Sequence, residues 1–180
     1  PASASVQAGL TQQFSATAKD QYGSPLSSQP AFAWAVSGGG SITSPGGLFT
    51  AGSTAGGPYT VTASSSGVNG SASVTVTAAP APNFSLSASP GSRSVRQGGS
   101  TTYTVTVAPT NGFSGQVTLS VSSGLPSGAT ATFSPNPTGT SSTLTVKAGT
   151  GVRGTFTLTI TGTSGSLTHT TTVSLTITRH

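Results

Sequence analysis

An internal repeat constrains the fold of this chain more than any other feature of its sequence. Residues 1–9 read PASASVQAG and residues 90–98 read PGSRSVRQG, so Pro, Ser, Ser, Val and Gly recur at equivalent positions. Each copy leads into a stretch in which apolar and polar residues alternate. The copies flank residues 78–82, where two prolines within five residues restrict the backbone. The repeat therefore predicts two similar modules joined by a short, semi-rigid connector.

Short apolar segments separated by turn-forming residues run along the whole chain. In most of them the apolar residues occupy every second position, as in Tyr103, Val105 and Val107. This spacing is typical of β-strands, and no stretch has the i, i+3, i+4, i+7 spacing of an amphipathic helix. About seven strands per module, with a turn every 8–12 residues, indicate an immunoglobulin-like sandwich. We therefore expect an all-β protein made of two immunoglobulin-like β-sandwiches in tandem.

In the first module an early strand is predicted where Phe14, Ala16 and Ala18 alternate with hydroxyl residues. A turn is expected to follow at residues 20–25, because this stretch contains Asp, Gly and Pro. Asp20 is expected to open that turn by accepting hydrogen bonds from backbone amides about two residues further on. This structural role accounts for Asp20 without a catalytic or metal-binding function.

Two Asn-Gly pairs predict further turns. The pair at residues 69–70 predicts a two-residue hairpin, because Asn and Gly accept the positive φ angles of a type I′ turn. The pair at residues 111–112 ends the turn-forming stretch PTNG and is expected to reverse the chain in the second module.

We place the first module at residues 1–79, the linker at residues 80–82 and the second module at residues 83–180. The second module starts with NFSLSAS ahead of Pro90, and this segment has the alternation of a strand. The first module starts at the equivalent Pro1, so we expect it to lack its first strand. A sandwich without that strand exposes an unpaired sheet edge, which we expect beside residues 1–8.

Three outcomes are open for that sheet edge. Preceding residues of a longer polypeptide could cover it, a strand from a neighbouring chain could complement it, or the edge needs no partner. The candidate donor lies in the last predicted strand, where Val173, Leu175 and Ile177 alternate with polar residues. The implied partners are neighbouring domains of a larger polypeptide and another copy of this chain.

The charge of the chain excludes several classes of function. Asp20 is the one acidic residue, against six Lys and Arg residues, and the formal net charge is +5. The positive charge comes from missing acids and not from a basic cluster, so no nucleic-acid partner is expected. With one carboxylate, two His and no Cys, we expect no catalytic residue, no metal site and no cofactor. No apolar run approaches the ~18 residues of a membrane-spanning helix.

The scarcity of carboxylates predicts resistance to acid. Acid unfolding arises mainly from protonating carboxylates that are paired or hydrogen-bonded in the native state, and this chain has one acidic side chain. We expect the melting temperature to change by only a few degrees between pH 7 and pH 3. Calorimetric scans at the two pH values measure this, and a fall of tens of degrees would contradict it.

Particular segments resemble known families. Four segments of the first module resemble the bacterial immunoglobulin-like group 2 family: TQQFSATAKD (11–20), FAWAVS (32–37), GLFTA (47–51) and YTVTA (59–63). Two segments of the second module are similar to immunoglobulin-like repeats beside catalytic domains in large secreted bacterial proteins: NGFSG (111–115) and GLPSGATATFSP (124–135). The resemblance implies spacers, stalks or adhesin segments, some of which assist polysaccharide binding, and it implies no catalytic residue.

We therefore expect a non-catalytic extracellular or cell-surface module of a bacterial protein that spaces other domains. One alternative is a carbohydrate-binding module, with Tyr22, Phe49 and Phe113 as the residues that would stack on a polysaccharide. Trp34 is instead expected in the core, because it is in phase with other apolar residues of its strand. The other alternative is a self-assembling extracellular fibre subunit that exchanges strands through its open sheet edge.

Overall fold

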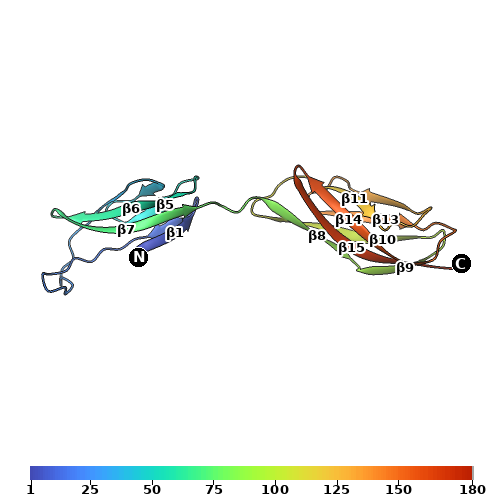
Figure 1. Ribbon diagram of the computed structural model, residues 1–180, viewed down its shortest axis with the longest axis horizontal. Coiled ribbons are helices and arrows are strands. Elements are labelled where there is room, and N and C mark those ends of the chain that lie inside the picture. The colour runs from blue at the N-terminus through green and yellow to red at the C-terminus, as the bar shows by residue number, and fades with distance from the viewer. Residues whose placement is uncertain (180) are drawn as a thin grey trace. The chain divides into compact units, whose positions relative to one another are not determined.

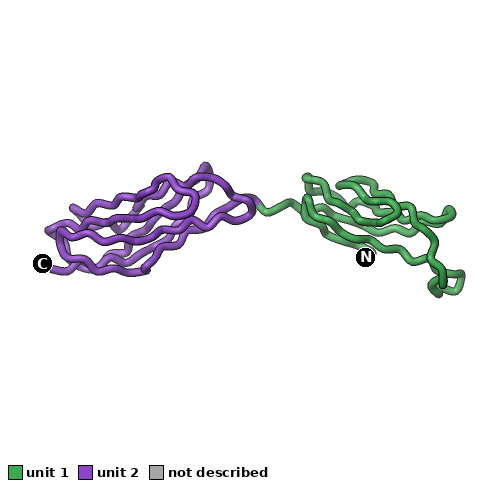
Figure 2. The backbone as a smooth tube through the Cα atoms, turned by 180° about the vertical axis from the view of Figure 1, so that it is seen from behind, with its two compact units in different colours: residues 1–80 green, residues 81–180 purple. Residues whose placement is uncertain are grey.

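The computed structural model describes residues 1–179, and its regular structure is all β-strand in this range (Figure 1). Two compact units divide the chain, unit 1 at Pro1–Pro80 and unit 2 at Ala81–His180 (Figure 2). The predicted all-β fold class is confirmed. Within the described range, no helix is long and apolar enough to cross a membrane.

Unit 2 is a sandwich of two four-stranded sheets, ordered β12-β13-β10-β8 and β11-β14-β15-β9. Its strands are β8 (Asn83–Ser89), β9 (Ser92–Arg96), β10 (Ser100–Thr110), β11 (Thr118–Ser123), β12 (Thr130–Ser134), β13 (Ser141–Lys147), β14 (Gly154–Ser164) and β15 (Leu167–Thr178). Neighbouring strands are antiparallel except β9, which is parallel to β15. Taken in chain order without β9, these sheets have the ABED and CFG strand order of an immunoglobulin-like sandwich.

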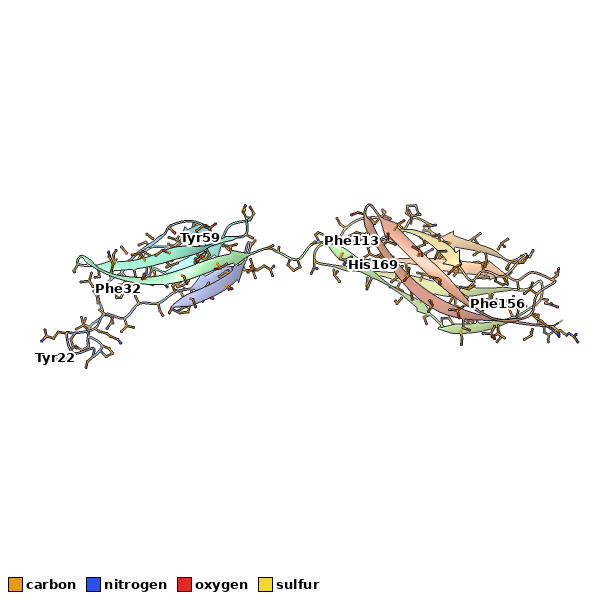
Figure 3. All side chains as sticks on the ribbon, in the orientation of Figure 1. Tyr22, Phe32, Tyr59, Phe113, Phe156 and His169 are labelled. Atoms are coloured by element: carbon orange, nitrogen blue, oxygen red, sulfur yellow. The ribbon has the colours of Figure 1, made fainter. Side chains whose placement is uncertain are left out.

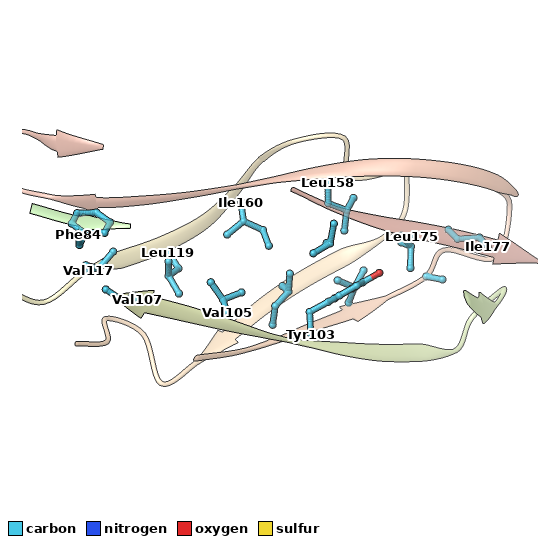
Figure 4. Close-up of a cluster of buried hydrophobic side chains, with 14 residues drawn as sticks. Phe84, Tyr103, Val105, Val107, Val117, Leu119, Leu158, Ile160, Leu175 and Ile177 are labelled. Atoms are coloured by element: carbon cyan, nitrogen blue, oxygen red, sulfur yellow. The ribbon is translucent and has the colours of Figure 1, made fainter. Parts of the chain in front are cut away.

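The core of unit 2 lies between these sheets (Figure 4). It follows from the period-two pattern, because alternate side chains of each strand point to the same face. Tyr103 is 1% exposed, and its hydroxyl donates a hydrogen bond to the carbonyl oxygen of Ser174 at 2.8 Å. Burial raises the pKa of the Tyr103 phenol, and the positive charge of Arg93 opposes this shift. The hydroxyl therefore stays protonated and keeps this hydrogen bond at neutral pH.

Unit 1 has the same layers with one strand fewer. Its strands are β1 (Ser3–Gln7), β2 (Thr11–Gln13), β3 (Ala33–Val36), β4 (Gly40–Ile42), β5 (Leu48–Ala51), β6 (Gly56–Ser65) and β7 (Val68–Thr77). The sheets are ordered β1-β7-β6-β3 and β2-β5-β4. The second sheet matches β10-β13-β12 of unit 2, and within residues 1–80 it contains no counterpart of β8. β2 is therefore an edge strand within this unit.

The core of unit 1 is smaller than that of unit 2. Its fully buried side chains include Phe14 and Phe49, whose rings meet edge to face with centroids 6.5 Å apart. Trp34, on β3, packs against this core while remaining partly exposed. The predicted core position of Trp34 is therefore confirmed in part.

Two local predictions for unit 1 are wrong. The strand expected through Phe14, Ala16 and Ala18 ends at Gln13 with β2, because its partner β5 begins at Leu48, opposite Gln13, and within residues 1–80 no other strand continues the pairing. The hairpin turn lies at residues 66–67, three residues before the expected Asn-Gly pair at residues 69–70. Ser65 pairs with Val68, and the intervening residues 66 and 67 have φ values of 51° and 81°.

Two other turns are as predicted. The carboxylate oxygen Oδ1 of Asp20 accepts hydrogen bonds from the backbone amides of Tyr22 and Ser24, both at 2.9 Å. In unit 2, Asn111 and Gly112 have φ values of 52° and 77° and reverse the chain after β10. Side-chain capping explains the first turn, and the tolerance of Asn and Gly for positive φ explains the second.

Candidate functional site

The three aromatic residues predicted to stack on a ligand lie in different environments, and Figure 3 labels two of them, Tyr22 and Phe113. Tyr22 is 84% exposed at the tip of the loop that Asp20 caps. Phe49 is 0% exposed on β5, so the prediction that it contacts a ligand is wrong: it faces inward on its strand and fills the core. Phe113 is partly buried and packs on Phe84, with ring centroids 5.1 Å apart. The structure therefore does not bring these rings together into one stacking surface.

The predicted strand donor is also corrected. Val173, Leu175 and Ile177 are at most 2% exposed, on a strand that pairs with β14 on one side and with β9 on the other. Donating this segment would require unit 2 to give up the centre of its core. Its alternation reflects this internal role.

Unit 1 contains a groove of about 730 Å³. One wall is the irregular segment 16–19 that follows β2, and the opposite wall is the hairpin between β6 and β7. Residues of the loop before β3 line the remaining side. The lining includes Ala16, Ala18, Phe32, Ser65, Val68 and Gly70. We call this space the unit 1 groove.

The two units can be superposed residue by residue through equivalent hydrogen bonds. The amide of Ala8 donates to the carbonyl of Thr77 at 2.9 Å, and the amide of Gln97 donates to that of Thr178 at 3.0 Å. Thr77 thus corresponds to Thr178, and counting back along β7 and β15 makes Val68 the counterpart of His169. On the other sheet, Thr11 pairs with Thr50 as Ser100 pairs with Lys147. Residues 15–21 therefore correspond to residues 104–110.

In unit 2 the space equivalent to the groove is filled by β8. This strand pairs antiparallel with residues 104–110 of β10. Its Leu86 side chain lies against Gly162, where an added Cβ would come within 2.9 Å of Leu86 Cδ1. The ring of Phe84 meets that of His169 edge to face at 4.7 Å between centroids. The Oδ1 atom of Asn83 lies 2.8 Å from His169 Nε2.

In unit 2, β8 covers particular residues of the sandwich. The corresponding residues of unit 1 line the unit 1 groove. Gly162 corresponds to Ser65 and His169 to Val68, and both of these residues border the groove. Val68 is 74% exposed, although the equivalent position in unit 2 is covered by an aromatic ring. The unit 1 groove is therefore the position of a missing β8.

The backbone along the groove is also unpaired. Strand amides point alternately to the two sides, and the amide of Phe14 donates inward to the carbonyl of Gly47 at 2.9 Å. Counted by the same alternation from Phe14, the amides of Ser15 and Thr17 fall on the side away from β5. Within residues 1–179 neither of these amides donates a hydrogen bond to another backbone group. The groove thus offers both unused donors and an apolar surface.

The groove carries little chemistry beyond hydrogen bonding and apolar contact. The described residues contain no group of three or more His, Cys, Asp or Glu side chains. Lys19 is the charged residue among the groove's lining residues. Asp20, the neighbouring carboxylate, is engaged by the turn amides described above. These residues can recognise a peptide backbone, but they do not form an acid–base or nucleophilic constellation.

The sequence predicted an open sheet edge beside residues 1–8, whereas these residues pair with β7 and the groove lies along residues 16–19. Its walls come from three segments that are separate in the chain, so no single stretch of the sequence carries a periodic signal for it. The detectable signal is a difference between the repeats: Ala16 and Ala18 stand where unit 2 has Val105 and Val107.

No protein-family model and no curated protein matches this chain. Among solved structures, domains 4 and 5 of the S-layer protein SbsC are 23% identical over 91% of this chain and 80% of that chain, with a TM-score of 0.46. Titin domains Z1Z2 in complex with telethonin are 18% identical over 99% of this chain and 93% of that chain, with a TM-score of 0.49.

An endo-fucoidan hydrolase of glycoside hydrolase family 107 is 13% identical over 83% of this chain and 24% of that chain, with a TM-score of 0.39. All three TM-scores are below 0.5, so the immunoglobulin-like fold is assigned from the strand order of each unit. Membership of the bacterial immunoglobulin-like group 2 family stays a prediction.

Proposed function

We propose that this chain is a non-catalytic, load-bearing spacer of an extracellular or cell-surface bacterial protein. The observation that carries the proposal is a strand pairing shared by both units. In unit 1, β1 pairs in parallel with the last strand, β7, from Ser3 to Gln7. In unit 2, β9 pairs in parallel with the last strand, β15, from Ser92 to Arg96.

Parallel pairing of these strands determines how each unit responds to tension. A force applied at the two ends of a unit pulls the paired strands in opposite directions along their own axes. The bonds between parallel strands are evenly spaced, so they resist this shear together and do not open one at a time. Such a unit transmits load between neighbouring domains without any chemistry at a site.

The composition supports this type of protein. One carboxylate and no Cys leave little for acid–base, metal or thiol chemistry, while the surface is rich in Ser and Thr. The extracellular and bacterial parts of the proposal rest on this composition and on the family resemblance of the segments quoted above. The partners in this proposal are the neighbouring domains of a larger polypeptide.

Single-molecule stretching of the full chain tests the proposal. We expect two unfolding events that release about 26–29 nm and about 33–36 nm of chain, from ~3.3–3.6 Å per residue in the two units. The variant Ala8→Pro removes the amide that donates to Thr77 and should lower the force of the shorter event. Ser5→Pro is the matched control, because alternation points the amide of Ser5 away from β7.

An unchanged unfolding force in Ala8→Pro would contradict the load-bearing account.

A second experiment distinguishes the spacer proposal from the carbohydrate-binding alternative. Retention on insoluble cellulose, chitin or xylan that is lost in Tyr22→Ala would support that alternative, because Tyr22 is the most exposed of the candidate stacking residues. The spacer proposal predicts that none of these polymers retains the chain.

A further inference from the structure

We propose that the unit 1 groove is a docking site for an extended peptide strand with an aromatic, a branched aliphatic and a small side chain at alternate positions. The strand would lie antiparallel to residues 15–21. This site is independent of the load-bearing function, which depends on β1 and β7. In the second unit of the same chain, a strand of this chemistry, β8, occupies the equivalent position.

The backbone of the groove defines the direction of the incoming strand. In unit 2, β8 runs antiparallel to β10, with Ser89 opposite Thr104 and Ser87 opposite Thr106. The counterparts of Thr104 and Thr106 are Ser15 and Thr17, whose amides make no backbone hydrogen bond within residues 1–179. An incoming strand in the β8 register would accept from both amides, as in strand addition to a sheet edge.

The side walls of the groove define the sequence of the incoming strand. In unit 2 the inward residues of β8 are Phe84, Leu86 and Ala88, which meet the hairpin end, the middle and the far end of the space. In unit 1 the hairpin end presents Val68, which is 74% exposed. Ala16 and Ala18 are smaller than their unit 2 counterparts Val105 and Val107, and the groove has a volume of about 730 Å³. The required pattern is therefore aromatic-x-aliphatic-x-small.

The chemistry of the groove favours a peptide over a small ligand. Its lining combines apolar side chains with one row of unused backbone amides spaced two residues apart, which matches the repeat of a strand. A small apolar molecule would use the apolar lining alone and would leave those amides to water. A peptide strand satisfies both features at once.

Peptide titration of the full chain tests this proposal. The probe is acetylated and amidated NFSLSAS, the sequence of β8, and the control peptide is NSSSSAS, which keeps the backbone but lacks the two large side chains. We expect NFSLSAS to shift the amide resonances of Ser15 and Thr17 and to slow their hydrogen exchange. The control peptide should bind at least tenfold more weakly, because burial of Phe and Leu drives docking.

A pair of variants locates the binding surface. Val68→Asp places a charge where the aromatic ring would pack and should weaken NFSLSAS binding at least tenfold. Leu10→Asp is the matched control, since Leu10 is 55% exposed and lies outside the groove. Both residues are exposed, so neither change is expected to prevent folding. Equal binding by both variants would overturn the proposal.

Joining the peptide covalently to the chain removes the entropic cost of bringing two separate molecules together. NFSLSAS is joined directly ahead of Pro1, which reproduces the junction between Ser89 and Pro90. We expect the melting temperature of unit 1 to rise by at least about 5 °C and the amides of Ser15 and Thr17 to become protected from exchange. An NSSSSAS fusion should produce neither effect. Equal melting temperatures and equal amide protection in the two fusions would overturn the proposal. Protection of the Ser15 and Thr17 amides in the unfused chain without peptide, caused by its dimerisation, would also overturn it.

Discussion

Replacing Phe84 by Ala is expected to lower the free energy of unfolding of unit 2 by about 3–5 kcal/mol, the usual range for truncating a buried Phe. Phe84 is 2% exposed and holds β8 against the rest of the sandwich through the rings of Phe113 and His169. Its loss removes this apolar contact and leaves a cavity at the end of the core. Unit 1 should be unaffected, because the residues that contact Phe84 all lie in unit 2.

Chemical denaturation with separate probes for the two units measures this effect. The chain has a single Trp, Trp34, so Trp fluorescence reports the unfolding of unit 1. Methyl resonances of buried residues such as Leu144 report unit 2. Ser87→Ala, on the exposed face of β8, is the control and should change stability by less than about 0.5 kcal/mol. A loss below 1 kcal/mol in Phe84→Ala, or an equal loss in both units, would contradict the expectation.

Gly124→Ala is expected to destabilise unit 2 by more than about 4 kcal/mol, a loss reached when strain and a steric clash combine. Gly124 has a φ of +82°, and an added Cβ would lie 1.8 Å from the carbonyl oxygen of Thr157. That oxygen belongs to β14, in the middle of a four-stranded sheet, so it cannot move aside cheaply.

Gly128→Ala separates the two contributions. Gly128 ends the same loop with a similar φ of +73°, but its nearest neighbour would be 3.8 Å from the added Cβ. Only the cost of a left-handed conformation then applies, about 1–2 kcal/mol. Denaturation curves of the two variants measure the difference. Similar losses in both would show that the clash at Gly124 is relieved by a shift of the loop.

The sequence predicted most strands of unit 2 because each has a partner on at least one side and a clear inward face. The strand through Phe14, Ala16 and Ala18 was wrong for a physical reason. Alternation describes which face is buried, but a strand also needs a neighbour for its backbone, and the sequence pattern does not show that neighbour.

The misplaced hairpin shows how strand register can override turn preference. With the turn at residues 66–67, Tyr59 pairs with Val74 and Val61 pairs with Ala72. A turn at the Asn-Gly pair would move β7 by several residues and place Pro80 opposite Tyr59. Proline has no amide hydrogen to donate there. The burial of Val74 and Val76 therefore determines the register, and it overrides the preference of the Asn-Gly pair for the turn positions.

The candidate site was harder to predict than the fold. Sequence reasoning searched for exposed aromatic rings, but Phe49 and Phe113 serve the packing of their own units. The groove is formed by segments that are distant in the chain. It is identified as a strand site by comparison with the space that Phe84 and Leu86 fill in unit 2. That comparison needs the register of β7 and β15, which a single sequence does not supply.

Amide hydrogen exchange on the unmodified chain tests the central claim most directly, because it compares equivalent positions in the two units. Thr104 and Thr106 lie opposite β8, and their amides should be strongly protected. The equivalent amides of Ser15 and Thr17 should exchange at rates close to those of an exposed segment, while the amide of Phe14, which donates to Gly47, stays protected. Equal protection of Ser15 and Thr104, or of Thr17 and Thr106, in the monomeric chain would show that the groove is already filled and would contradict the account.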